Sequence, residues 1–413
     1  MRAVVLSGGG SKGAYEIGVW KALRKLNISY EIVTGTSVGA LNAAFMVQRD
    51  YLKAMLLWFN LNSSMVYDSN MNIQSNKDFV KHAKKILLDG GMNVKNLERT
   101  VNKYINVKKI YKSSIDLGIV TVKYPFFQPL ELTKKQIPPN KLTDYLIASA
   151  SCFPAFPKKK IDDSQYIDGG LYDNLPINLA ISMGATEVIA VDLNAVGIKR
   201  HVKNKNIPVQ IISPKSDTGS FLVFDKVSAR RAIRLGYNDT MKAYHRLDGN
   251  IFTFKKGVLQ SNYDTYKNTY IHFFNSLLDS QSKSFALKVI QLSIYNRIFH
   301  ESSDSVFFLR FNEIVEKVGI ILHVDDSMIY SMDKYHNALF DQIAELSKQS
   351  FDAIHSHLRS SKIKRLFHDD LMVAYLYHYL LKNSDVKDIS NLILIFPNAF
   401  LSALYLFVVQ GSR

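Results

Sequence analysis

The stretch "VVLSGGGSKGAYEIGVW", Val4 to Trp20, joins an apolar β-like run to the first helical pattern through four closely spaced glycines. A short buried strand followed by such a turn and an amphipathic stretch indicates the start of a βαβ unit. Two unrelated chemistries use a Gly-rich turn of this kind, because its backbone N–H groups can hold either the phosphates of a nucleotide or the oxyanion of an acyl transfer. The rest of the sequence decides between them.

The composition predicts a globular protein in a reducing cellular compartment. The chain has 413 residues, of which 47% are hydrophobic, so it can bury a large core and is expected to form two domains. Its one cysteine, Cys152, excludes an intrachain disulfide framework. The start "MRAVVLSGGG" has too few apolar residues for a secretory signal, so we expect a cytoplasmic protein.

The formal net charge of +16 comes from the first part of the chain. Residues 1–260 hold 37 Lys and Arg against 20 Asp and Glu, whereas residues 261–413 hold 15 against 16. The basic runs are Lys108–Lys112, Lys158–Lys160 and Lys199–Lys205. Such a field attracts phospholipid headgroups or nucleic acid, and the alternative is a well-solvated basic surface without a specific partner.

Strand patterns alternate with helical patterns up to about residue 255. We expect strands at Ala3–Ser7, Tyr30–Gly35, Ile115–Val122, Thr186–Leu193, Val209–Ser213 and Ile251–Phe254. This alternation predicts an α/β fold with a mostly parallel central sheet, whose site lies in loops at the carboxyl ends of the strands.

Beyond residue 260 strand signals almost vanish. Long helical patterns follow, such as "KSFALKVIQLSIYNRIF" (residues 283–299) and "RLFHDDLMVAYLYHYLLKN" (residues 365–383). We therefore expect a catalytic domain over residues 1–258 and an all-helical C-terminal extension over residues 259–413. The apolar stretch Leu392–Val409 is interrupted by Pro397, which favours a helix packed inside this domain over a membrane anchor.

Gly8, Gly10 and Gly13 satisfy G-x-G-x-x-G, the pattern of a dinucleotide site. That site also needs an acidic residue at the end of the second strand, but Glu31 lies at the start of this strand. No Lys-Ser or Lys-Thr pair of a phosphate-binding loop follows the glycines. A nucleotide-binding protein therefore stays only as an alternative.

The second strand ends instead in Gly35-Thr36-Ser37-Val38-Gly39, a G-x-S-x-G motif before the helical "ALNAAFMV". This context predicts a nucleophile elbow, and the alternative is a serine that only caps the helix. An activated serine needs oxyanion donors, which the backbone of Gly8, Gly9 and Gly10 can supply. Lys12 is expected to fix this turn or to meet headgroup charge.

The serine also needs a base, and the histidines do not provide one. Only His82 of the eleven histidines precedes residue 200, and it lies in a lysine-flanked helical stretch. In "YIDGGLYDNLPI", by contrast, Asp168 follows a short apolar run and precedes Gly169 and Gly170. A close, oriented and partly desolvated aspartate can act as the base, whereas the alternative is a β-turn with an exposed carboxylate.

Four stretches now resemble, in order, the motif regions of the patatin-like phospholipase family: "SGGGSKGAYEIGV", "GTSVGALNAA", "ASASCFPAFP" and "YIDGGLYDNLPI". The resemblance covers about residues 1–255. It implies a three-layer α/β/α fold and a lipid acyl hydrolase with a Ser-Asp dyad, in which Ser37 is the nucleophile and Asp168 the base. It also implies an oxyanion hole of Gly8, Gly9 and Gly10. The supporting motif residues are Ser11, Lys12, Gly13, Gly35, Val38, Gly39, Gly169 and Gly170.

The sequence thus predicts a carboxylic ester hydrolase that cleaves fatty acyl esters of membrane lipids through an acyl-enzyme. We expect no metal or organic cofactor, because no His, Cys, Asp and Glu cluster has ligand spacing. Phospholipid is the expected partner, with peripheral contact to an anionic membrane surface and no nucleic acid, while an oligomer stays open. A second hypothesis is an effector of signalling or defence whose hydrolase activity needs a ligand or an assembly step.

Two stretches depart from the family pattern or bear on the rim of the site. Lys158 to Lys160 follow "FPAFP" where the family has apolar residues, which places cations near the rim and favours anionic lipids. In "KYPFFQPLEL", Phe126, Phe127 and Pro129 form either an apolar lip or part of a core strand pair.

Overall fold

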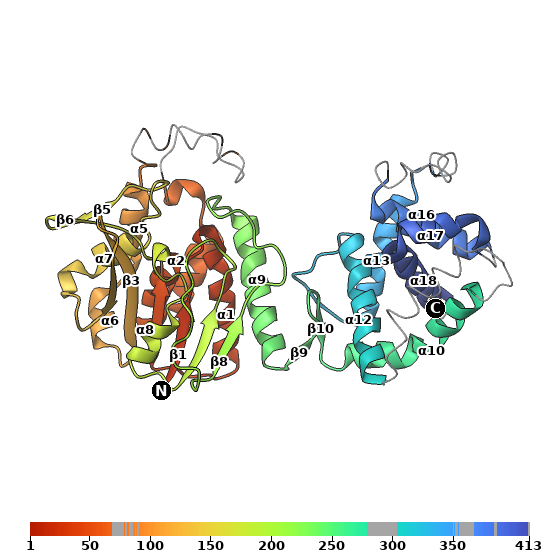
Figure 1. Cartoon of the computed structure of the whole chain (residues 1–413), viewed down its shortest axis with the longest axis horizontal. Helices are drawn as coiled ribbons and strands as arrows, with labels where there is room; N and C mark the ends of the chain where they lie inside the picture. The colour runs from red at the N-terminus through yellow and green to blue at the C-terminus, as the bar shows by residue number, and fades with distance from the viewer. Residues whose placement is uncertain are drawn as a thin grey trace. The chain divides into compact units, whose positions relative to one another are not determined.

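The computed structural model describes residues 1–67, 91–278, 304–349, 367–383 and 386–411, and six single residues: 78, 81, 86, 88, 351 and 354. The chain forms two compact units, Met1–Tyr244 and His245–Arg413 (Figure 1). The sequence placed this division at residues 258 and 259. The observed boundary comes earlier because strand β10 (Thr253–Lys255) pairs both with β9 (Leu247–Asp248) and with β11 (Ile329–Tyr330) in the second unit.

The first unit is built on one large mixed sheet. Its strands are β1 (Arg2–Leu6), β2 (Ile32–Thr36), β3 (Asp116–Tyr124), β4 (Gln128–Thr133), β5 (Lys159–Ile161), β6 (Ser164–Asp168), β7 (Glu187–Val191) and β8 (Val209–Ile212). Strands β3, β2, β1, β7 and β8 run parallel in that order. Strands β4, β5 and β6 are antiparallel to their neighbours. The mostly parallel central sheet predicted from the sequence is confirmed.

Helices cover both faces of this sheet because side chains alternate along its strands. Val4 and Leu6 belong to one core cluster, and Ala3 and Val5 belong to another on the opposite face. The first cluster receives α1 (Ala14–Lys25), α2 (Val38–Val47), α3 (Tyr51–Asn60), α5 (Lys95–Tyr104), α6 (Val107–Lys112), α7 (Leu142–Ser149) and α9 (Lys226–Ala243). The second cluster receives α8 (Ile177–Ser182). The three-layer α/β/α arrangement is therefore present.

The register around β3 brings two distant chain segments together. Thr36 at the end of β2 pairs with Val120, and Asp168 at the end of β6 pairs with Thr121. Strand β4 pairs with residues 118–123 and so occupies the other edge of β3. Strands β2 and β6 therefore share one edge of β3 and meet end to end. Neighbouring strand residues are about 3.3 Å apart, so this pairing sets Asp168 beside the residue that follows Thr36.

The second unit is mainly helical. Its helices are α10 (Val258–Leu278), α12 (Asp304–Ile321), α13 (Met332–Leu346), α16 (Asp369–Lys382), α17 (Ser390–Ile395) and α18 (Pro397–Gly411). The helical C-terminal part expected from the sequence is confirmed. Strands β9, β10 and β11 add a small sheet to this unit, and of these only β11 lies within residues 259–413. The predicted strand Ile251–Phe254 joins this sheet as β10. The helical pattern of residues 283–299 and the predicted surface position of His82 lie outside the described residues.

The apolar stretch Leu392–Val409 is divided between α17 and α18, and Pro397 is the first residue of α18. A proline fits this position because the first helical N–H needs no intrahelical acceptor. Side chains such as Phe400, Leu404 and Val409 are buried in the core of the second unit. Among the described residues, no helix has the length and apolar character needed to cross a bilayer.

Candidate active site

Ser37 stands at a tight turn between β2 and α2. Its backbone has φ 57° and ψ −128°, a conformation that costs a non-glycine residue about 1–3 kcal/mol. A Cβ on Gly39 would lie only 2.4 Å from the carbonyl oxygen of Leu6, so the turn packs against β1 in a way that needs a glycine. Ser37 occupies the N-cap position of α2, but its side chain forms no capping hydrogen bond. The hydroxyl is therefore free for another role.

A second serine holds the backbone of this turn. The amide N–H of Ser37 donates to Ser149 Oγ at 2.9 Å, and the Ser149 hydroxyl donates to the carbonyl oxygen of Val120 at 2.6 Å. Ser149 is fully buried at the end of α7 and lies in the third motif stretch. Its hydroxyl thus ties the strained turn to the middle of β3. The sequence did not single out Ser149, because nothing in "ASASCFPAFP" distinguishes one serine from the others.

Asp168 lies at the carboxyl end of β6, buried beside Ser37. The Ser37 hydroxyl lies beside its carboxylate and lowers the pKa of that group, and the N–H of Gly170 donates to Asp168 Oδ1 at 2.7 Å. The amide N–H of Asp168 donates to the carbonyl oxygen of Ser151 at 2.9 Å. The alternative of an exposed aspartate in a β-turn is wrong. The structure brings the two predicted catalytic side chains together across the fold.

Burial controls the proton affinities in the site. Desolvation raises the pKa of Asp168 to about 6, although the hydrogen bonds from Ser37 and Gly170 oppose this shift. A carboxylate with this pKa is a better proton acceptor than an exposed one and is still ionised at neutral pH. Burial and the charge of Asp168 raise the pKa of Cys152 to about 12. The Cys152 thiol is thus kept protonated and unreactive.

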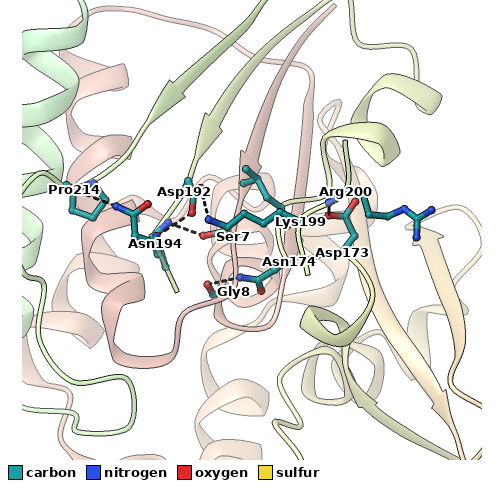
Figure 2. A network of polar contacts seen from close by, with 11 residues as sticks. Ser7, Gly8, Asp173, Asn174, Asp192, Asn194, Lys199, Arg200 and Pro214 are labelled. Carbon is teal, nitrogen blue, oxygen red and sulfur yellow. Dashed lines mark hydrogen bonds and ion pairs between the residues drawn. The ribbon is translucent and has the colours of Figure 1, made fainter. Parts of the chain in front are cut away.

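The Gly-rich turn lies directly against Ser37. Asn174 clamps the turn through Gly8, as Figure 2 shows. The N–H of Gly8 donates to the carbonyl oxygen of Asn174 at 3.1 Å, and Asn174 Nδ2 donates to the carbonyl oxygen of Gly8 at 3.2 Å. A Cβ on Gly8 would lie 2.3 Å from Asn174 Oδ1 and 3.1 Å from Ser37 Cβ. Only a glycine fits here. Asn174 therefore couples the turn to the segment that follows Asp168.

The hydrogen bond to Asn174 removes Gly8 from the set of available oxyanion donors. Within the part of the chain that the structure describes, the amides of Gly9 and Gly10 donate to no protein acceptor. Gly10 also lines the same cavity as Ser37. Of the three glycines expected to supply oxyanion donors, Gly9 and Gly10 thus have available amides, whereas the amide of Gly8 is occupied.

A wider polar network supports these loops (Figure 2). The Asp173 carboxylate accepts long hydrogen bonds from the amides of Leu175 (3.3 Å) and Arg200 (3.4 Å), and its pKa is raised by burial to about 6. The Asp173 carbonyl oxygen accepts a hydrogen bond of 2.7 Å from Thr36 Oγ1. The residue before Ser37 is therefore anchored to the loop after Asp168.

Ser37 opens into an apolar cavity on the α2 face of the sheet. The cavity and the open solvent at its mouth together have about 800 Å³ of space between atoms. Its apolar wall includes Leu41, Phe45, Leu57, Trp58, Val101, Phe156 and Leu222. The chemistry of this wall suits a hydrocarbon chain that reaches Ser37.

The other predicted site residues take supporting places. Val38 lines the cavity, and the carbonyl oxygen of Gly13 accepts a hydrogen bond from Asn42 Nδ2. Ser11 donates to the carbonyl oxygen of Ser220. The Lys12 side chain forms no ion pair within the described residues.

Glu31, the acidic residue considered for a dinucleotide site, lies at the amino end of the sheet and away from the Gly-rich turn. Its carboxylate accepts a hydrogen bond from the amide of Arg2. Among the residues that the structure describes, no histidine lines the cavity, and no three His, Cys, Asp or Glu side chains are grouped to hold a metal ion.

Part of the chain is similar to known proteins. Residues 4–181 match the family model of the patatin-like phospholipases. The chain is 28% identical over 203 residues to rat patatin-like phospholipase domain-containing protein 7, covering 47% of this chain and 14% of the relative. It is 24% identical over 204 residues to lysophospholipase NTE1 of Debaryomyces hansenii, covering 47% of this chain and 12% of that protein.

Among solved structures, VipD from Legionella pneumophila aligns with a TM-score of 0.38 and 14% identity, over 98% of this chain and 91% of that one. The match to the curated relatives spans only about one seventh of their length.

Proposed function

We propose that the chain is a serine acyl hydrolase that cleaves fatty acyl esters of membrane lipids, since residues 4–181 match the family model of the patatin-like phospholipases. One observation carries the proposal. The hydroxyl of Ser37, held on a strained turn, lies beside a buried carboxylate with a raised pKa and lines an apolar cavity. A relative named for a patatin-like phospholipase domain and one named as a lysophospholipase each match 47% of the chain.

The proposed acylation step uses the groups around this cavity. Ser37 Oγ attacks the ester carbonyl carbon while its proton passes to Asp168. The amides of Gly9 and Gly10 stabilise the oxyanion of the tetrahedral intermediate, a contribution of about 10²- to 10³-fold in rate for each lost donor. Asp168 then gives its proton to the leaving alcohol, and the acyl group stays on Ser37.

Deacylation repeats the same transfers with water. Asp168 accepts a proton from a water molecule, whose oxygen attacks the acyl carbon, and the fatty acid leaves as Ser37 recovers its proton. During both steps the apolar wall of the cavity holds the acyl chain away from water. The strained backbone of Ser37 fixes the hydroxyl in advance, so that little reorganisation is needed when the ester binds.

Hydrolysis by the purified full chain tests this proposal. We expect release of fatty acid from phospholipid vesicles and of alcohol from a soluble short-chain ester, and a loss of at least about 10³-fold in both reactions for Ser37→Ala. Ser182→Ala at the end of α8 is a matched control, since its hydroxyl donates only to the carbonyl oxygen of Leu179. Activity of Ser37→Ala equal to that of the control contradicts the proposal.

The same assay distinguishes the effector hypothesis from a hydrolase that is active on its own. A hydrolase that needs a ligand or an assembly step is inactive as a purified protein and gains activity when a cellular extract is added. Activity of the pure chain without additions favours the simple hydrolase.

A further inference from the structure

An exposed aromatic turn projects from the edge of the sheet that carries Ser37. Strands β3 and β4 are joined by a turn in which Phe126 and Phe127 are 86% and 59% exposed. Strand β3 runs parallel to β2 and continues past it, because Tyr124 lies three residues beyond Thr121, the partner of Asp168. At about 3.3 Å per residue, the turn begins about 10 Å beyond Asp168 on the same side of the sheet.

The aromatic turn is joined to the wall of the cavity. The ring of Tyr124 contacts Phe127 at 5.9 Å and Phe153 at 6.1 Å between centroids. Phe153 directly follows Cys152, which lines the cavity. The ammonium group of Lys158 lies 4.1 Å from the centroid of the Tyr124 ring. The turn is thus a structured aromatic element beside the cavity, with a cation at its base.

A second apolar loop follows β7 at the same edge. Val196 is 99% exposed and Ile198 is 54% exposed. The loop is held in place, because the N–H of Ile198 donates to the carbonyl oxygen of Gly170 (2.9 Å) and its own carbonyl oxygen accepts from the N–H of Asn174 (2.5 Å). These contacts fix two solvent-facing aliphatic side chains next to the segment that holds Asp168.

The two loops stand on either side of the site. Strands β3 and β7 flank β2 and β1, whose carboxyl ends lead to Ser37 and to the Gly-rich turn. With strands about 4.8 Å apart, β3 and β7 are about 14 Å from each other. Exposed apolar side chains on hydrogen-bonded loops near an apolar cavity indicate a surface that another molecule covers when the protein acts.

The charges near the aromatic turn identify the partner. Lys159 forms ion pairs with Glu98 and Asp144, but Lys158 and Lys160 form none with the described residues. Unpaired lysines next to exposed aromatic side chains suit the boundary of an anionic bilayer, where the rings enter the acyl region and the ammonium groups meet phosphates.

We propose that the Phe126–Phe127 turn and the Val196–Ile198 loop dock the first unit on an anionic phospholipid surface, with Lys158 and Lys160 among the headgroups. In this position the carboxyl edge of the sheet, with Ser37, faces the lipid. The inference deepens the proposed function by naming the surface from which the substrate comes. Docking itself needs no hydrolysis, so the two can fail separately.

Vesicle binding by the full chain carrying Ser37→Ala tests the docking surface without hydrolysis. We expect this protein to bind vesicles of phosphatidylcholine with phosphatidylserine, and Phe126→Ser with Phe127→Ser to weaken binding by about tenfold or more. Ile211→Ser is the matched control, since Ile211 is 58% exposed and lies in β8, four strands away from β3 in the sheet.

A charge pair of variants tests the lipid sign. Lys158→Gln with Lys160→Gln should weaken binding by roughly fivefold for each lysine, and only on vesicles that contain phosphatidylserine. Lys108→Gln with Lys112→Gln removes two exposed lysines of α6, which precedes β3 at the opposite edge, and should leave binding unchanged.

The outcomes separate docking from catalysis. Equal binding by the phenylalanine variant and the Ile211→Ser control, or no vesicle binding by the Ser37→Ala protein, overturns the docking surface. With Ser37 restored, the phenylalanine variant should keep its hydrolysis of a soluble short-chain ester, and a loss there also contradicts a docking role. If the wild type hydrolyses no ester but the Ser37→Ala protein binds vesicles, the proposed function fails and the docking surface stands.

Discussion

Each unit of the chain buries a hydrogen-bonded polar cluster, and the difference between the two clusters shows what marks a reactive site. In the first unit the Ser37 hydroxyl lies beside the Asp168 carboxylate, which accepts a hydrogen bond of 2.7 Å from the N–H of Gly170. In the second unit the Tyr405 hydroxyl donates to Asn262 Oδ1 at 3.1 Å and shares a hydrogen bond of 2.8 Å with His336 Nε2. Burial raises the pKa of both Asp168 and Tyr405. A shifted pKa alone therefore does not distinguish them.

Backbone conformation and access do distinguish them. Ser37 has a positive φ and lines a cavity, whereas Tyr405 lies inside the regular helix α18 and is fully enclosed. A strained backbone persists where the surrounding structure holds it, and such positions cluster at functional sites. We therefore assign chemistry to the first cluster and core stability to the second.

The largest expected effect is a loss of kcat/KM when the Asp168 carboxylate is replaced, compared with removal of the Tyr405 hydroxyl. Asp168→Asn should lower kcat/KM for a soluble ester by about 10³-fold, because the amide cannot accept the Ser37 proton. Tyr405→Phe should leave the same kcat/KM within about twofold. Steady-state kinetics on both variants test this, with Asp116→Asn at the start of β3 as an acid control. A comparable loss for Asp168→Asn and Asp116→Asn contradicts the assignment.

A second prediction concerns the serine that holds the elbow. Ser149→Ala removes the acceptor of the Ser37 amide, so the strained turn can relax and misplace the hydroxyl. We expect kcat to fall by about 10- to 100-fold with KM little changed, since a misplaced nucleophile affects the chemical step rather than binding. Ser149→Thr keeps the hydroxyl and should recover part of kcat. Equal kcat for the alanine and threonine variants argues against a positioning role.

The pH profile sharpens the comparison further. Asp168 must be ionised to accept a proton, and its pKa is about 6. Thus kcat/KM should fall about tenfold for each pH unit below 6 and reach a plateau above it. The profile should be measured between pH 4.5 and 8 on a soluble ester, because the surface charge of lipid vesicles also changes with pH. A profile that stays flat down to pH 4.5 is inconsistent with Asp168 as the base.

The smallest effects concern stability, and they should have opposite signs. The folded-state pKa of Asp168 lies above its unfolded value, so its ionisation in the fold costs stability at neutral pH and this cost disappears as the pH falls from about 6 towards 4. Asp168→Asn should therefore raise the free energy of unfolding by about 1–3 kcal/mol at pH 7.5, and by less at pH 4.5.

Tyr405→Phe should instead lower the free energy of unfolding by about 1–3 kcal/mol, because Asn262 and His336 lose a buried partner. Urea unfolding of both variants at the two pH values checks these signs. Destabilisation by Asp168→Asn at pH 7.5 would show that the carboxylate stabilises the fold rather than strains it.

Local patterns were sufficient for much of the first unit. The predicted strand Val209–Ser213 corresponds to β8 and Thr186–Leu193 to β7, because short apolar runs flanked by turn residues report their own conformation. The G-x-S-x-G stretch likewise indicated the turn at Ser37, since its glycines are required by close backbone contacts within the motif itself.

Features that depend on distant pairing were not predictable. The sequence does not reveal that β6 meets β2 end to end on β3, or that Asn174 would occupy the amide of Gly8. The sequence also left open whether "KYPFFQPLEL" forms an apolar lip or a core strand pair, since this depends on the register of β3 and β4. The observed register leaves Phe126 and Phe127 in the turn. The small sheet in which β10 pairs with β9 and with β11 was not predicted, because β9 and β11 have only two residues each.

The most direct test of the central claim is peptide mapping of the full chain after reaction with a fluorophosphonate, which reports the activated nucleophile itself. The account predicts one major adduct on the peptide that contains Ser37, and a strongly slowed reaction in Asp168→Asn. A major adduct on a different serine, or an undiminished rate in Asp168→Asn, would contradict the dyad.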